Sequence, residues 1–154
     1  MKRRTFLKGT LASGMAGMAV SAGLLTPRAV LAAWPESSFG AKSIPSALEA
    51  LLGSASHSPS GDIKIKAPDI AENGAVVPIT ISSSMSGVEA IAVMVEKNPQ
   101  PLACAYDLGS NTEAFVSTRV KMGKTSDLVA VVKSGGKLFS AKKTVKVTIG
   151  GCGG

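Results

Sequence analysis

The sequence predicts an antiparallel β-sandwich of about seven short strands, preceded by one helix. From residue 63 onward, short apolar segments recur about every ten residues, and most of them alternate apolar with polar residues. Turn-forming pairs such as Asn73-Gly74 and Gly135-Gly136 separate these segments. No helical segment lies between them, which disfavours the crossover connections of a parallel sheet. The predicted fold class is therefore all-β.

The helix is predicted at residues 44–52, before the first strand. Ser43 is suited to cap it, Pro45 fits its first turn, and Gly53 ends it. The apolar residues of this segment recur at helical spacing, at Ile44, Ala47, Leu48, Leu51 and Leu52.

The strands are predicted from alternation or from dense apolar runs. Leu102, Cys104, Tyr106 and Leu108 are expected to share one face of a strand, and Met94 and Met122 are expected in the core. The expected strands lie at 63–66, 77–82, 89–96, 102–108, 118–122, 128–132 and 144–149.

The charge of the chain is concentrated at its beginning. The 154 residues have a formal net charge of +7, but residues 1–32 hold five of the 17 basic residues and no acidic one. Residues 33–154 therefore carry 17 − 5 = 12 basic and 10 acidic residues, a net of +2. These charges are scattered and aromatic residues are few, which disfavours nucleic-acid binding.

The cysteine and histidine content limits the chemistry of the chain. Two cysteines, one histidine and no Cys-x-x-Cys sequence exclude a Cys/His metal cluster and dithiol redox chemistry. The sequence predicts neither a bound metal nor a cofactor.

Residues 1–32 have the three-part layout of a secretory signal peptide. Arg3 and Arg4 open an Arg-Arg-x-Phe-Leu-Lys sequence, which is typical of a twin-arginine signal. Cleavage is expected after Ala32 or after Ala33, which places the mature protein in the periplasm. The competing interpretation is an uncleaved membrane anchor, but the apolar stretch of about 16 residues is shorter than the roughly 20 that a span needs.

The twin-arginine route carries proteins that have already folded. A protein that uses it usually holds a cofactor or a partner. Because no cofactor motif is present, we expect a partner subunit that is exported together with this chain.

The chain ends in Gly150-Gly151-Cys152-Gly153-Gly154, beyond a β-sandwich domain expected at residues 33–149. Glycine loses the most backbone freedom on ordering and adds no packing, so the segment 150–154 is expected to be a flexible arm. Five extended residues span about 17 Å, and only one of them has a side chain. A thiol on such a thin arm suits a carrier whose intermediate must enter several enzymes.

Cys152 is not expected to catalyse a reaction alone. A thiol with an ordinary pKa near 8.5 is only about 3% thiolate at pH 7. No Lys, Arg or His lies within the arm to lower that pKa, and Lys146 is expected to point outward from a strand as a solvated residue. Activation must come from a visited active site, so the chain is predicted to be a carrier and not an enzyme.

The other cysteine and the histidine have simpler explanations. Cys104 is expected to be a small apolar residue of a strand, because unpaired cysteine is often buried. A disulfide between Cys104 and Cys152 is the less favoured alternative. His57 lies in a loop rich in Ser, Pro and Gly and is expected to be solvated.

Four segments of the chain resemble the SoxY family, the covalent sulfur carriers of the periplasmic thiosulfate-oxidising Sox system. The C-terminal Gly-Gly-Cys-Gly-Gly is the most specific of them, and the resemblance extends over essentially the whole chain. The segments are 67–81 (APDIAENGAVVPITI), 96–102 (EKNPQPL), 116–122 (VSTRVKM) and 146–154 (KVTIGGCGG).

The resemblance implies an immunoglobulin-like sandwich, a SoxZ partner subunit that forms a heterodimer with this chain, and Cys152 as the attachment site. In that family a c-type haem protein couples thiosulfate oxidatively to the thiol, and a dimanganese hydrolase then releases sulfate. A molybdenum–haem sulfane dehydrogenase, where present, oxidises the remaining sulfur. Only Cys152 and glycines 150, 151, 153 and 154 match the family motif, so the resemblance gives Cys104 no role in sulfur chemistry.

Two other functions are compatible with parts of the sequence. An exported structural or adhesive sandwich domain would carry the same fold with an incidental flexible tail. A carrier of the ubiquitin-like kind would instead use the C-terminal carboxylate of Gly154, although export away from ATP disfavours it.

Overall fold

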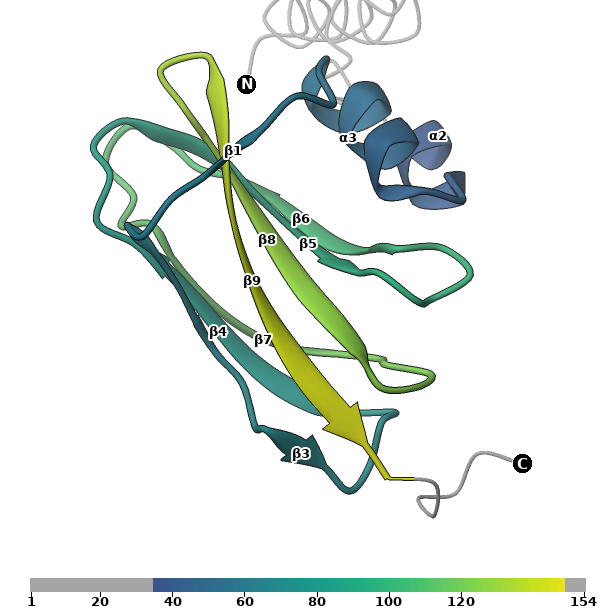
Figure 1. Ribbon diagram of the computed structural model, residues 1–154. Helices are drawn as coiled ribbons and strands as arrows, with labels where there is room; N and C mark the ends of the chain where they lie inside the picture. Colours follow the sequence, from purple (N-terminus) through teal and green to yellow (C-terminus); the bar gives the residue numbers. More distant parts are fainter. Residues whose placement is uncertain (1–34, 149–154) are drawn as a thin grey trace, which may run out of the picture. The chain divides into compact units, whose positions relative to one another are not determined.

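The computed structural model describes residues 35–148. They form two β-sheets packed face to face, and two helices cover part of the outer side of the larger sheet (Figure 1). The predicted all-β sandwich is confirmed. The predicted signal peptide with its cleavage sites after Ala32 or Ala33, and the arm at residues 150–154, lie outside the described residues.

The predicted helix is confirmed as α3 (Ile44–Leu52). Ser43 caps it, because its Oγ accepts a hydrogen bond of 3.3 Å from the backbone N–H of Ser46. Gly53 ends it with a φ of 77°, a left-handed conformation that glycine adopts without a steric penalty. A further helix, α2 (Glu36–Gly40), was not predicted, since five residues are too few to show a helical period.

The larger sheet has the strand order β1-β9-β8-β5-β6, and β3 also pairs with β9. Its long strands pair in antiparallel fashion, as predicted. The two short parallel pairings of β1 and β3 with β9 are not evident from the sequence. The strands are β1 (Ser58–Pro59), β3 (Ile70–Ala71), β5 (Val88–Val95), β6 (Leu102–Asp107), β8 (Ser126–Ser134) and β9 (Lys137–Val147).

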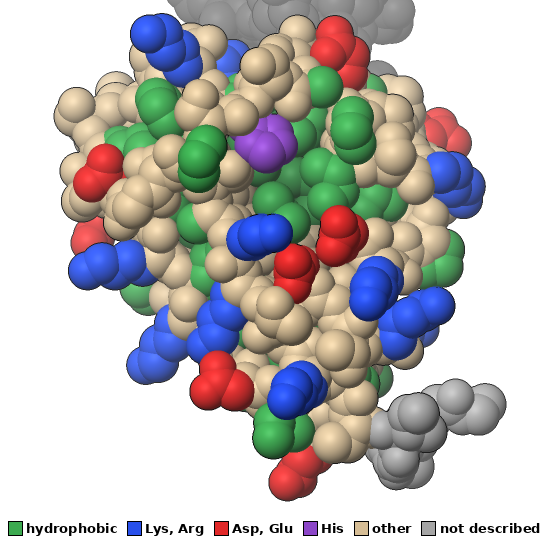
Figure 2. Space-filling model, in the orientation of Figure 1, with side chains coloured by type: hydrophobic (Ala, Val, Ile, Leu, Met, Phe, Trp, Pro, Cys, Tyr) green, Lys and Arg blue, Asp and Glu red, His purple; other side chains and the backbone are tan. Residues whose placement is uncertain are grey.

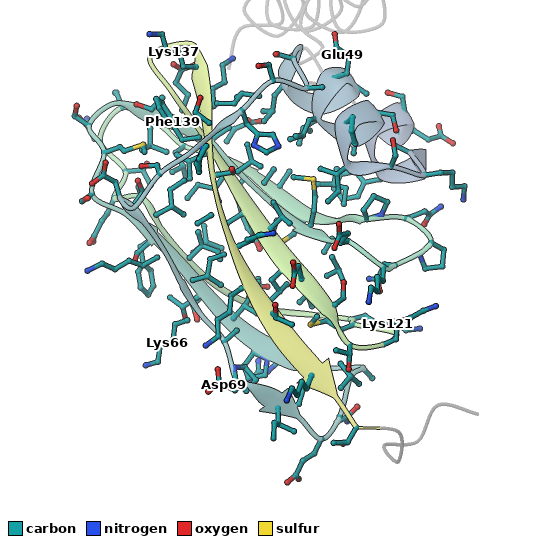
Figure 3. The ribbon with its side chains drawn as sticks, in the orientation of Figure 1. Glu49, Lys66, Asp69, Lys121, Lys137 and Phe139 are labelled. Carbon is teal, nitrogen blue, oxygen red and sulfur yellow. The ribbon has the colours of Figure 1, made fainter. Side chains whose placement is uncertain are left out.

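The smaller sheet consists of β2 (Ile63–Lys66), β4 (Val77–Ser83) and β7 (Phe115–Val120). Its strands are antiparallel, in the order β2-β4-β7. Alternation turns most of its apolar residues toward the other sheet, although Phe115 is exposed, and leaves Lys66 exposed on the outer face (Figure 3).

Strand β9 starts at Lys137, well before the expected start at residue 144. Its first part shows no clear alternation because both of its faces are covered. Leu138 packs beneath the helices, whereas Phe139 packs against the core between the sheets. Gly135 and Gly136, with φ of 56° and 72°, form the tight turn that joins β8 to β9.

Two apolar clusters hold the layers together. The cluster between the sheets includes Ile79, Ile91 and Leu128, and the cluster between the helices and the larger sheet includes Leu48 and Val131. Met94 and Met122 are both buried, as predicted.

The predicted common face of β6 is wrong for Leu102. The register shifts between Val93 and Met94, so Val93 pairs with Cys104 and Met94 pairs with Leu102, with Ala103 as the extra residue of a β-bulge. Leu102 therefore packs beneath the helices, while Cys104 packs against the core between the sheets. A bulge reverses the alternation, and strand alternation in the sequence does not reveal it.

Candidate functional site

The residues predicted to form the site, Cys152 with glycines 150, 151, 153 and 154, lie outside the described residues. The structure does describe the residues that directly precede this segment in the chain. We call Lys146, Val147 and Thr148 the arm root, because the first two end β9 and all three directly precede residues 149–154.

Strand β3 holds one side of the arm root in a parallel ladder. Ile70 pairs with Lys146, and Ala71 pairs with Val147. The backbone N–H of Lys146 donates to the carbonyl of Asp69 at 2.9 Å, and that of Thr148 donates to the carbonyl of Ala71 at 3.1 Å. These bonds continue the pairing of β9 up to the last described residue.

Thr125, in the loop before β8, holds the other side of the arm root. The backbone N–H of Val147 donates to its Oγ1 at 3.0 Å, and this Oγ1 donates to the carbonyl of Val147 at 3.4 Å. The side chain of Thr125 therefore makes hydrogen bonds to Val147 that the backbone of a neighbouring strand would otherwise make. The pairing of β8 with β9 ends before this residue, at Val145.

Lys143 fastens the segment before β3 to β9. Its Nζ lies 2.7 Å from the carbonyl of Ala67 and 3.0 Å from Oδ1 of Asp69. Asp69 lies beside the lower part of β9, just before β3 (Figure 3). This contact ties the chain to the sandwich directly ahead of the ladder that holds the arm root.

Gly74, in the loop after β3, fits between the arm root and the end of the smaller sheet. A Cβ atom on Gly74 would lie 2.7 Å from Cγ1 of Val147 and would overlap the carbonyl oxygen of Met122. The carbonyl of Gly74 in turn accepts a 2.7 Å hydrogen bond from the backbone N–H of Met122. This close backbone approach explains why glycine occupies the position.

The lysines before the arm differ in their partners. Lys142 Nζ is 3.7 Å from Oδ2 of Asp127, and Lys143 is held by Asp69. Lys146 is exposed, as predicted, and forms no ion pair with any residue in the described range 35–148.

Residues 48–152 match the family model of the sulfur oxidation protein SoxY. The chain belongs to the SoxY family. It is 44% identical to a solved structure, that of the sulfur carrier protein SoxY from Chlorobium limicola f thiosulfatophilum, with a TM-score of 0.62. The alignment covers 67% of this chain and 94% of that one.

Two further solved structures are much less similar. A chain of a structure on T cell specificity and activation by the bacterial superantigen toxic shock syndrome toxin-1 has 9% identity over 56% of this chain and 99% of that one, with a TM-score of 0.39. An engineered protein has 10% identity over 56% of this chain and 20% of that one, with the same TM-score. Likeness at this level carries no functional argument. No match was found among curated proteins.

Cys104 of this SoxY-family chain lies on β6, far along the sequence from the arm root. It is half-buried and unpaired, and it packs against the core between the sheets, in keeping with its predicted structural role. Burial raises the pKa of its thiol, and a hydrogen bond with Tyr106 lowers it only in part. The thiol is therefore protonated at neutral pH.

Tyr106 connects the two sheets at their open edge. It lies on β6, an edge strand of the larger sheet, and forms a hydrogen bond with Thr118 on β7, an edge strand of the smaller sheet. That bond lowers the pKa of Tyr106, but burial and the neighbouring Cys104 outweigh it and raise the pKa overall. The contact between Tyr106 and Cys104 is therefore structural. It does not provide a catalytic base for the Cys104 thiol.

His57 is exposed, as expected, but it is also hydrogen-bonded. Its Nδ1 lies 2.9 Å from Oγ of Ser140 on β9, next to the short pairing of β1 with that strand. Figure 2 shows hydrophobic side chains gathered beside this histidine. The composition of the loop predicts that His57 is exposed. It does not predict the hydrogen bond with Ser140, which lies 83 positions later in the chain.

The described part of the chain has neither a cluster of metal ligands nor a membrane-spanning helix. Residues 35–148 contain no group of three or more His, Cys, Asp or Glu side chains that could hold a metal ion. Among the same residues, no helix is long and apolar enough to cross a membrane.

Proposed function

We propose that this chain carries the sulfur intermediates of thiosulfate oxidation as covalent adducts of Cys152 and presents them to partner enzymes. As a member of the SoxY family it is a sulfur-oxidation carrier protein. The observation that carries the proposal is the C-terminal Gly-Gly-Cys-Gly-Gly, together with a family match that extends as far as residue 152.

The proposed chemistry takes place on the sulfur of Cys152. The thiol and thiosulfate form an S–S bond, which yields a cysteine S-thiosulfonate. The thiol proton is released to water, and two electrons pass to the c-type haem partner. Water then cleaves the S–SO₃ bond in the hydrolase, which releases sulfate and leaves a persulfide on Cys152. In both steps this chain supplies only the sulfur atom and the arm that carries it.

A tethered intermediate has a physical advantage over a free one. The sulfur species are small anions that diffuse away if they are released, whereas attachment keeps them at a high effective concentration near the next enzyme. The contacts around the arm root support this mechanism, because the attachment point is held on both sides by β3 and Thr125. A fixed base and a thin arm let one thiol search a defined volume.

The proposed assembly is a heterodimer with the SoxZ subunit, visited in turn by the haem and dimanganese enzymes and, where present, by the molybdenum–haem enzyme. Mass spectrometry of the native complex under non-reducing conditions tests this proposal. It should show a second subunit and a thiosulfonate or persulfide adduct that maps to Cys152.

Replacement of the cysteine distinguishes the competing functions. Cys152→Ser should abolish thiosulfate-dependent respiration while folding and partner binding stay normal, and the matched control Cys104→Ser should retain activity. Full activity of Cys152→Ser would favour the structural or adhesive domain. Modification found at the carboxylate of Gly154 would instead favour the ubiquitin-like kind of carrier.

We further propose that the protein acts in the periplasm after twin-arginine export. Replacing Arg3 and Arg4 together by lysine should leave the precursor in the cytoplasm, because the paired arginines distinguish this route. Arg28→Lys, at an arginine of the same segment outside the pair, is the control and should be exported normally. Export of the Arg3/Arg4 variant at the wild-type level would overturn this part of the proposal.

A further inference from the structure

The outer face of the smaller sheet carries positive charge and no carboxylate. In β2, β4 and β7 every second residue points away from the core, because the residues between them pack against the other sheet. Three of these outward residues, Lys64, Lys66 and Arg119, are exposed cations. The sequences of the three strands contain no Asp or Glu. We call the outward side chains of β2, β4 and β7 the basic face.

The strand register spreads the three cations across the basic face. On one side of β4, Lys64 pairs with Ser82 and Lys66 pairs with Thr80. Arg119 lies on β7, on the other side of β4. Neighbouring strands lie about 4.8 Å apart and alternate residues of a strand about 7 Å apart, so the cations cover an area and not a single point. Lys66 points away from the sandwich in Figure 3.

No carboxylate of the described residues neutralises these charges. The three cations take part in none of the three ion pairs found among residues 35–148. Asp62 and Glu113 lie just before β2 and β7, at one end of the sheet, because the first residues of both strands pair with the end of β4. Asp69, which follows β2, is paired with Lys143. The middle of the basic face therefore keeps an uncompensated positive charge.

The composition of the basic face distinguishes between a protein partner and a lipid surface. A protein interface has an apolar centre from which charged residues are depleted. Here the centre is polar, since Thr80 and Ser117 pair there and their hydroxyl oxygens lie 3.3 Å apart. The one large apolar side chain, Phe115, is 54% exposed and lies at the end of the face. A membrane with anionic phospholipids complements this arrangement, because its charge is continuous and of one sign and its interface accepts an aromatic ring.

We propose that the basic face binds reversibly to a membrane surface that contains anionic phospholipids. Lys64, Lys66 and Arg119 donate hydrogen bonds to the lipid phosphate groups, and the ring of Phe115 enters the head-group region. Each cation near such a surface strengthens binding about fivefold, so three of them give a weak and reversible contact. This inference does not rest on the proposed carrier function, because none of these residues belongs to the arm or to the arm root.

The test is co-sedimentation of the mature chain, purified with its partner subunit, with lipid vesicles. At low salt the wild type should bind vesicles of phosphatidylglycerol and phosphatidylcholine in equal parts, but not vesicles of phosphatidylcholine alone. High salt should release it, because the attraction is screened. The triple variant Lys64→Gln with Lys66→Gln and Arg119→Gln should lose affinity on the order of 100-fold. Phe115→Ser should weaken binding by a smaller factor.

Two controls separate the basic face from the total charge of the chain. Lys42→Gln with Lys97→Gln and Lys137→Gln removes three exposed cations that lie outside the smaller sheet and form no ion pair within residues 35–148. This variant should bind almost as tightly as the wild type. Exchange of lysine for arginine, and of arginine for lysine, at the three cationic positions of the basic face keeps the charge and should keep the binding. All of these side chains are exposed, so the melting temperatures should agree.

Three results would overturn the proposal. The first is equal binding of the wild type to anionic and neutral vesicles, or no binding to either. The second is an equal loss of affinity in the two triple Lys/Arg→Gln variants, which would show that only the net charge matters. The third is binding by the chain alone but not by its complex with the partner subunit, which assigns the basic face to the contact with that subunit. Because the assay contains no enzyme and no sulfur substrate, a failure here leaves the proposed carrier function standing.

Discussion

Gly74 and Val147 approach each other so closely that a Cβ atom on Gly74 would lie 2.7 Å from Cγ1 of Val147. The two residues are far apart in the sequence, but the parallel pairing of β3 with the end of β9 brings their segments together. This contact joins the loop after β3 to the end of β9.

Gly74→Ala should loosen the arm root. The added methyl overlaps the carbonyl oxygen of Met122, a backbone atom that cannot turn away, so we expect a loss of about 1–3 kcal/mol in the free energy of unfolding. Urea denaturation gives the stability, and hydrogen exchange at Val147 and Thr148 shows where the structure loosens. Gly61→Ala is the control, because a Cβ atom there meets nothing within 4 Å. Equal stability of the two variants would contradict the role of Gly74.

Thr125→Val should release one side of the arm root at almost constant side-chain volume. It removes both hydrogen bonds to Val147, and a lost hydrogen bond of this kind costs roughly 1 kcal/mol. Exchange of the Val147 amide should become several-fold faster, while amides in the middle of β8 stay protected. Thr80→Val, which loses only a 3.3 Å contact with Ser117 on the exposed face, is the control. Unaltered exchange at Val147 would show that Thr125 does not fix the strand end.

The two cysteines should react with thiol reagents at clearly different rates. Cys104 is half-buried and burial raises the pKa of its thiol, so less of it is thiolate at pH 7 than of an exposed cysteine. We expect a fast phase from Cys152 and a phase about tenfold slower from Cys104. Cys104→Ser should remove only the slow phase, and denaturant should merge the two. A fast phase that survives Cys152→Ser would disprove this assignment.

The raised pKa of Cys104 also predicts a loss of stability in alkali. In the unfolded chain the thiol has an ordinary pKa near 8.5, so it ionises there first as the pH rises. The stabilising contribution is fully present below about pH 8.5 and is lost as the pH rises through the higher pKa of the folded state. Cys104→Ala should therefore lose less unfolding free energy than the wild type between about pH 8 and 10. Because the pKa of Tyr106 is raised as well, Tyr106→Phe should show a change of the same sign.

Extension of the C-terminus should block turnover without disturbing the fold. Three bulky residues added after Gly154 widen the tip of the glycine-rich segment, so it no longer fits a narrow channel. We expect loss of enzymatic loading of Cys152, measured by mass spectrometry, with an unchanged melting temperature. Addition of three glycines is the matched control and should retain most of the loading. Normal loading of the bulky variant would show that Cys152 does not need to enter a channel.

The sequence predicts the parts of the fold that depend on local patterns. Ser43, Pro45 and Gly53 determine the limits of α3, and the alternation in residues 77–82 predicts β4. The first half of β9 was missed because apolar residues cover both of its faces, and the change of face at Leu102 was missed because Ala103 forms a bulge. Both features arise from pairing with distant strands, which a local pattern does not record.

For the candidate site, too, some features follow from the sequence and others arise only from folding. Residues 150–154 are four glycines and one cysteine. The sequence alone therefore establishes a thiol on a segment in which no other residue has a side chain. The surroundings of the arm root were not predictable, because β3, Gly74, Thr125 and Lys143 come from separate parts of the chain. Only folding brings them together, since hydrogen bonds and close packing act between neighbours in space and not between neighbours in sequence.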